Sequence, residues 1–110
     1  MSDLTGKHCV PCESDGFPAL TPEQARDLME HVPGWQLSPD AKHISRKFAF
    51  KNFKEALDFT NLVGELAEEE GHHPDVLTSW GKVVVTLTTH SIRGLSENDF
   101  ILAAKINALS

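Results

Sequence analysis

Helix-start signals recur at three places along the chain and divide it into segments. The stretches Thr21-Pro22-Glu23-Gln24, Asn52-Phe53-Lys54-Glu55 and Ser96-Glu97-Asn98-Asp99 each pair a capping side chain with a polar or acidic residue three positions later. The first also carries proline at the first helical position. We predict that the first helix runs to about His31, that the second ends at Gly71, and that the third continues to the C-terminus.

Alternating apolar and polar residues predict four strands between these helices. Strands are expected over 34–37 and 43–50, and then as a hairpin over 76–79 and 82–90 that turns at Trp80-Gly81. Strand pairs joined by short turns favour an antiparallel sheet. The order helix-strand-strand-helix-strand-strand-helix therefore predicts a two-layer α+β fold, in which a four-stranded antiparallel sheet carries three helices on one face.

The composition is that of one ordinary domain. The chain has 110 residues, of which 40% are hydrophobic and 24% charged, so it can bury a core without metals or disulfides. We interpret residues 1–20 as an irregular N-terminal arm and residues 21–110 as the domain. No apolar run could span a membrane, and residues 1–10 lack the apolar segment of a secretory signal, so we expect a cytoplasmic protein. A formal charge of -6 with scattered basic residues argues against direct nucleic-acid binding.

The segment Glu68-Glu69-Glu70-Gly71-His72-His73-Pro74-Asp75 is the densest in chemical groups. Carboxylates at a helix C-terminus oppose the helix dipole, and a solvated helix end accounts for Glu69 and Glu70. Glu68 suggests chemistry, because a carboxylate close to an imidazole stabilises its protonated form and so provides a proton donor near neutral pH. Pro74 restricts the histidine before it to an extended conformation, which predicts a stiff turn.

His90 is the third candidate imidazole. We expect it to close the strand over 83–89, on the same face as Thr88. The hydroxyls of Thr88 and Thr89 could form hydrogen bonds with a planar polar heterocycle. Asp99 has an ordinary explanation as the third residue of a helix cap.

Two metal-binding alternatives stay open at this point, although we expect no metal. Three histidines could supply three of the ligands that zinc needs: His72, His73 and His90. No helical His-x-x-x-His pattern supports that site. In the arm, His8, Cys9 and Cys12 form half a metal site at most, and a disulfide between the two cysteines would close too short a loop to stabilise a fold.

The spacing of these residues resembles the signature of the pterin-4a-carbinolamine dehydratases. Five separated elements agree with it: Glu68, His72-His73-Pro74, Trp80, His90 and Asp99. Further similarities surround them, in Trp35 after Pro33-Gly34, in residues 48–53 and in Gly94-Leu95-Ser96, so the resemblance covers roughly residues 20–110. Many relatives carry a carboxylate directly before the histidine pair. This chain has Gly71 there, so a carboxylate acting on His72 would be Glu68 or Asp75.

The resemblance implies two antiparallel hairpins with three helices, and a lyase that dehydrates the carbinolamine left on a pterin by an aromatic amino acid hydroxylase such as phenylalanine hydroxylase. The 4a-hydroxyl leaves as water and N5 loses a proton, which gives quinonoid dihydropterin without a cofactor or metal. The resemblance implies His72 and His90 for proton transfer and His73 chiefly for holding the pterin. Five further residues would orient the histidines or bind the ring: Glu68, Pro74, Thr88, Thr89 and Asp99.

Protein partners are a separate question. Animal members of the family also bind a transcription factor, so the alternative function is an interaction module acting as a transcriptional or dimerisation cofactor. The second helix carries a further apolar strip: Phe59, Leu62 and Leu66. We expect this strip to join subunits of a homodimer or homotetramer, although wide burial of a long helix in a small protein would also explain it.

Overall fold

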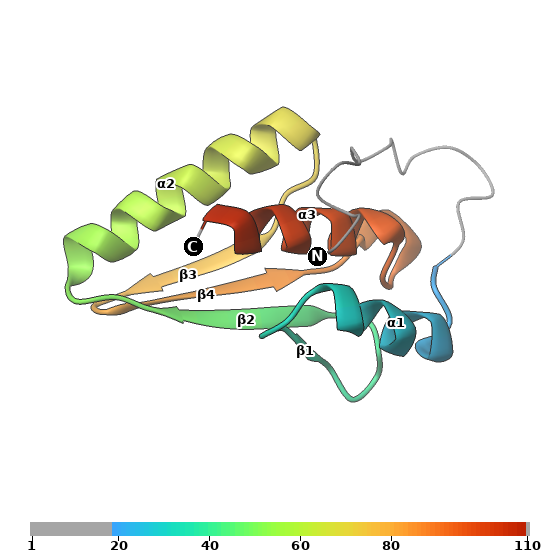
Figure 1. The fold of residues 1–110 in the computed structure, drawn as a ribbon. Coiled ribbons are helices and arrows are strands. Elements are labelled where there is room, and N and C mark those ends of the chain that lie inside the picture. The colour runs from blue at the N-terminus through green and yellow to red at the C-terminus, as the bar shows by residue number, and fades with distance from the viewer. Residues whose placement is uncertain (1–18, 110) are drawn as a thin grey trace.

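The computed structural model of the protein describes residues 19–109. Its elements are α1 (Pro22–Leu28), β1 (Gln36–Leu37), β2 (Ile44–Ala49), α2 (Phe53–Glu70), β3 (Asp75–Ser79), β4 (Lys82–Leu87) and α3 (Glu97–Leu109). Short 3₁₀ helices follow α1 at Met29–His31 and β4 at His90–Ile92. The predicted α+β class and element order are confirmed (Figure 1). Most of the predicted arm, with His8, Cys9 and Cys12, lies outside the described residues.

The predicted capping side chains begin the first two helices. At α1, the Thr21 hydroxyl accepts a hydrogen bond from the Gln24 amide at 3.1 Å, and the Gln24 side chain accepts one from the Thr21 amide at 2.9 Å. At α2, the Asn52 side chain accepts from the Glu55 amide at 2.8 Å. These bonds satisfy amide groups that lack partners within the first turn of a helix. The second helix ends at Gly71, which has the left-handed φ of 68° that glycine adopts without strain.

The four strands form one antiparallel sheet in the order β1-β2-β4-β3. The hairpin of β3 and β4 turns at Trp80-Gly81 as predicted, and the pairing of β2 with β4 stops at Ile44 and Leu87. The expectation that His90 closes a strand is wrong. Beyond Leu87 the chain has no β2 residue left to pair with, and His90 instead begins a 3₁₀ helix.

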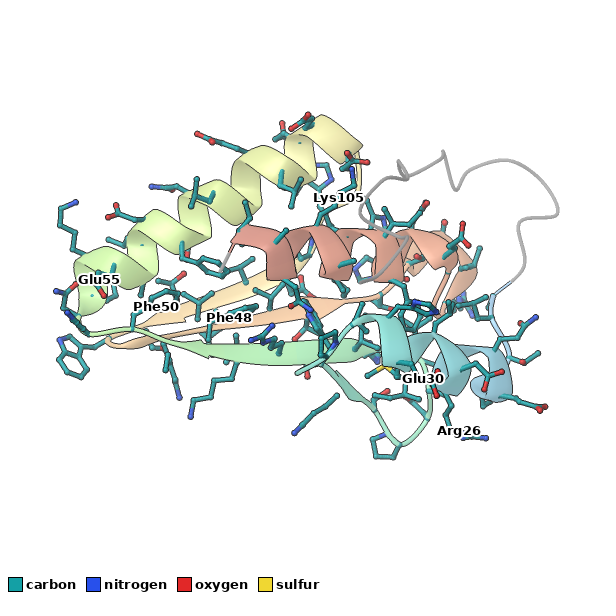
Figure 2. The ribbon with its side chains drawn as sticks, in the orientation of Figure 1. Arg26, Glu30, Phe48, Phe50, Glu55 and Lys105 are labelled. Carbon is teal, nitrogen blue, oxygen red and sulfur yellow. The ribbon has the colours of Figure 1, made fainter. Side chains whose placement is uncertain are left out.

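One hydrophobic core lies between the sheet and the helices, and α1, α2 and α3 all contribute to it. Alternate residues of the central strands face it: Ile44, Phe48, Val83, Val85 and Leu87. Phe48 and Phe50 point toward α2 (Figure 2), where each packs against the ring of Phe59. Phe59 is 4% exposed and Leu66 is partly buried against this core, so the predicted strip of Phe59, Leu62 and Leu66 is not one exposed surface.

The end of α2 is tied to α3 by an ion pair. Lys105 reaches from α3 toward α2 (Figure 2), and its Nζ lies 3.1 Å from Glu70 Oε2. The Glu70 side chain is only 2% exposed. The interpretation of Glu70 as part of a solvated helix end is therefore wrong, because its side chain is buried and paired with Lys105. Among the described residues no helix is both long and apolar enough to cross a membrane.

Candidate functional site

The candidate site forms where the end of α2, the end of β4 and the start of α3 meet. The left-handed Gly71 turns the chain out of α2, so that His72 and His73 occupy the short link to β3. After β4, the chain passes through Thr89 and a 3₁₀ helix before α3 begins. A backbone bridge between Thr89 and Gly94 closes this connection and holds both its ends in place.

Asp99 joins these segments through both oxygens of its carboxylate. Its Oδ1 lies 2.6 Å from His72 Nε2, while its Oδ2 accepts from the Thr89 hydroxyl at 2.7 Å and from the Ser96 amide at 2.9 Å. Asp99 is fully buried, and the His72 side chain is 11% exposed. His72 Nε2 therefore faces an oxygen that accepts hydrogen bonds when the carboxylate is ionised. The other ring nitrogen, Nδ1, forms no hydrogen bond with the described residues.

A second hydroxyl extends this arrangement. Ser96 Oγ lies 2.8 Å from Thr89 Oγ1 and both residues are buried. Because the Thr89 hydroxyl donates its single proton to Asp99, the Ser96 hydroxyl donates to Thr89. The sequence suggested Ser96 only as a helix cap. Its side chain supports the carboxylate that holds His72.

His73 and Glu68 form a separate pair on the surface. His73 Nε2 contacts Glu68 Oε2, and the two side chains are 61% and 78% exposed. They lie at the end of α2 and directly after it, which places them next to His72 along the chain. The carboxylate in contact with His72 is thus that of Asp99 from α3, whereas Glu68 contacts the neighbouring imidazole.

His90 lies at a cavity of about 230 Å³, which is lined by Lys42, His43, Thr88, His90 and Arg93. Thr88 is buried, and its hydroxyl lies 2.7 Å from the carbonyl oxygen of Lys42 and 3.3 Å from that of Gly94. The hydroxyl of Thr88 therefore holds the walls of the cavity together.

The predicted residues thus fall into linked groups. Thr89 and Asp99 are joined to His72, Glu68 is joined to His73 across the turn at Gly71, half-buried Pro74 follows His73, and Thr88 lies with His90. Within the described residues His90 shares no hydrogen bond with the other two histidines. In residues 19–109 no three His, Cys, Asp or Glu side chains are arranged to hold a metal ion.

Known proteins share this sequence over almost its whole length. A relative from Rubrobacter xylanophilus is 50% identical over 99% of this chain and 100% of its own. One from Methylococcus capsulatus is 53% identical over 97% of this chain and 93% of its own. The names of both assign them to the pterin-4-alpha-carbinolamine dehydratases. The mitochondrial pterin-4-alpha-carbinolamine dehydratase 2 of Arabidopsis thaliana is 46% identical over 99% of this chain and 60% of its own.

Two solved structures and a family model point to the same family as these relatives. The structure titled a transcriptional coactivator/pterin dehydratase from Brucella melitensis has a TM-score of 0.77 and 35% identity, over 83% of this chain and 97% of its own. A pterin dehydratase-like protein described as a RuBisCO assembly factor has a TM-score of 0.60 and 25% identity, over 72% of this chain and 92% of its own. The model of the pterin 4 alpha carbinolamine dehydratase family matches residues 18–109, and the chain belongs to that family.

Proposed function

We propose that the protein is a lyase that dehydrates 4a-hydroxytetrahydropterin to quinonoid dihydropterin and water. The observation that carries the proposal is the hydrogen bond from His72 to the buried carboxylate of Asp99. This bond fixes which imidazole nitrogen carries the inner proton and aims the other outward. Dehydration requires proton transfer and no change of oxidation state, and an oriented imidazole can carry out proton transfer.

The reaction requires two proton transfers on one substrate. The 4a-hydroxyl takes up a proton as its C–O bond breaks and water leaves, and the N5–H bond gives up its proton to a base. His72 can serve one of these transfers through Nδ1, because Asp99 offsets the positive charge of the imidazolium. His90 serves the other. Its ring is exposed at the cavity, and no hydrogen bond within the described residues occupies it.

The remaining residues hold the substrate or the catalytic groups. His73, paired with Glu68, binds the pterin beside His72, and Pro74 stiffens the turn that presents them. Thr89 positions Asp99, and Thr88 positions the segment that carries His90. The protein uses no metal or cofactor, acts in the cytoplasm and regenerates the pterin of an aromatic amino acid hydroxylase such as phenylalanine hydroxylase.

The test is a stopped-flow measurement of 4a-carbinolamine loss with and without the protein. His72→Ala and His90→Ala should mainly lower kcat, by up to about 100- to 10,000-fold for a general acid or base. Because the carbinolamine also dehydrates without the enzyme, the measured fall in rate is smaller than the true fall in kcat. His73→Ala should mainly raise KM. His31→Ala changes an exposed histidine after α1 and serves as the control.

A second function is favoured by the two solved relatives, whose titles name a transcriptional coactivator and an assembly factor. On that alternative, this protein is an interaction module that acts as a transcriptional or dimerisation cofactor. A wild-type protein that leaves the rate of carbinolamine loss unchanged would exclude the lyase and favour the module. A kcat crippled only in His73→Ala would keep the lyase but reverse the roles of the histidines.

A further inference from the structure

Among the residues that the structure describes, the cavity beside His90 is lined by four nitrogen-bearing side chains and by no carboxylate. Lys42 and His43 come from the segment before β2, and His90 and Arg93 come from the 3₁₀ helix after β4 and the residue that ends it. Thr88 is the fifth residue that lines the cavity. Such a grouping is unusual in this chain, which has sixteen acidic and ten basic residues. It has the chemistry of a site for an anion.

We propose that this cavity is a subsite for an anionic group, a phosphate ester or a carboxylate, on the side chain of the pterin substrate. The inference rests on the proposed function, which places the pterin ring at His90. The cavity of about 230 Å³ is smaller than the roughly 300–1,000 Å³ of a pocket that encloses a whole small ligand. It therefore suits a substituent of a ligand whose ring lies next to it.

The two fixed positive charges of the subsite are available to a ligand. Within residues 19–109 neither the Lys42 ammonium nor the Arg93 guanidinium forms an ion pair. Arginine presents a planar fork of donors that matches the oxygens of phosphate and carboxylate, and lysine adds a point charge.

Asp40 is the acidic residue nearest to this cluster along the chain, and its hydrogen bonds hold it to one side. The Ser38 hydroxyl donates to Asp40 Oδ1 at 2.6 Å, and the Lys42 backbone amide donates at 3.1 Å. These two bonds hold the pKa of Asp40 below its ordinary value. His43 Nδ1 lies 3.9 Å from the same oxygen. Asp40 thus lies against His43 and also attracts the charge of Lys42, but it forms no ion pair with the Lys42 ammonium or the Arg93 guanidinium.

The backbone that carries these charges is fixed on both sides of the cavity. The Thr88 hydroxyl binds the carbonyl oxygen of Lys42, and the Arg93 amide donates to the carbonyl of His90 at 3.2 Å. Two residues that are not glycine adopt left-handed φ angles there, Ala41 at 57° and Arg93 at 53°. Such conformations are strained for residues other than glycine and cluster at ligand sites. They occur here at Arg93 and at the residue before Lys42, and both Lys42 and Arg93 line the cavity.

The experiment compares three 4a-carbinolamines that differ only in the side chain at C6: a neutral diol, its phosphate ester and a carboxylate. We expect kcat/KM at low salt to be about 10- to 100-fold higher for at least one anionic substrate than for the neutral one, as charged hydrogen bonds would give. Added salt should reduce this preference.

The variants Lys42→Gln and Arg93→Gly, combined, should reduce the preference to nearly one. Glycine suits the left-handed conformation of residue 93, so this change removes the guanidinium without straining the backbone. Lys51→Gln removes the same charge beyond the far end of β2 and should leave the preference intact. Equal kcat/KM values for all three substrates, or a preference that survives in the double variant, would overturn the subsite and leave the dehydratase standing.

A failure of the proposed function gives a different result: the protein would then accelerate the dehydration of none of the three substrates. In that case, calorimetry with stable oxidised pterins carrying the neutral or the phosphate side chain still decides the subsite. Tighter binding of the phosphorylated pterin by the wild type, lost in the double variant, supports the subsite. Equal binding of the two pterins refutes it.

Discussion

At the scale of single residues, Asp99 shows how one side chain serves both the fold and the candidate site. Its Oδ2 accepts the Ser96 amide as a helix cap would, and its Oδ1 accepts the His72 imidazole. Asp99 therefore caps the start of α3 through one oxygen and contacts His72 through the other. The carboxylate is fully buried and the His72 side chain is 11% exposed, so solvent has little access to this contact.

We predict that Asp99→Asn cripples catalysis while the domain still folds. The amide must point its oxygen at the Ser96 amide and the Thr89 hydroxyl, so its NH₂ group faces His72 Nε2. That group donates where Asp99 accepts, which moves the imidazole proton to Nδ1. We expect kcat to fall by about 100-fold or more and the pH profile of kcat to change, as measured by stopped flow. Glu65→Gln removes an exposed charge from α2 and is the control. An unchanged kcat in Asp99→Asn would contradict the role of the pair.

Which residues would touch was harder to infer from the sequence than which residues matter. The spacing of Glu68, the histidines and Asp99 pointed to the site, but the partner of His72 comes from 27 positions away in the chain. Thr88 looked suited to a ligand, whereas its hydroxyl binds the backbone of a residue 46 positions away. Side-chain partners are decided by tertiary packing, and periodicity carries no information about that packing.

At the scale of elements, the helices and strands could be predicted because local chemistry encodes them. The capping residues and Gly71 mark where helices begin and end, and alternation marks the strands. The end of β4 could not be predicted in this way. The alternation continues past Leu87, but strand pairing stops where β2 begins at Ile44. The length of a strand depends on its partner, which is a non-local property.

The contact between α2 and α3 leads to a prediction about stability. Lys105→Met removes one partner of an ion pair in which the Glu70 side chain is 2% exposed. Breaking a buried pair costs about 3–5 kcal/mol where the remaining charge is uncompensated, and the further contact of Glu70 places this variant at the lower end of that range. We expect a loss of about 3 kcal/mol in the free energy of unfolding, measured by urea denaturation. Lys54→Met breaks the exposed pair with Asp58 and should cost less than about 1 kcal/mol. Equal losses in the two variants would show that Glu70 is solvated.

At the scale of the whole molecule, one side of the fold has apolar surface and an open strand edge. β3 forms one edge of the sheet, and its outer Leu77 is 60% exposed. Phe53 and Leu57 are 44% and 41% exposed on α2, which packs beside β3 through the hydrogen bond of Thr60 with Thr78. Large apolar side chains beside an unpaired strand edge favour association with another chain. This surface replaces the strip of Phe59, Leu62 and Leu66 as the candidate subunit contact.

We therefore predict that the protein forms a homodimer or homotetramer through the β3 edge and the adjoining side of α2. A second copy is the simplest partner, since it offers the same strand edge and the same apolar residues. A twofold axis would pair the two strand edges and bury the two apolar surfaces against each other. Light scattering at micromolar concentration should give a mass of two or four chains.

Leu57→Glu places a charge in the contact and should reduce the mass to one chain without loss of helical circular dichroism. Gln36→Glu adds the same charge on β1, at the opposite edge of the sheet, and should leave the assembly intact. A wild-type protein with the mass of one chain would refute the prediction outright, and an assembly that survives Leu57→Glu would place the contact on another surface.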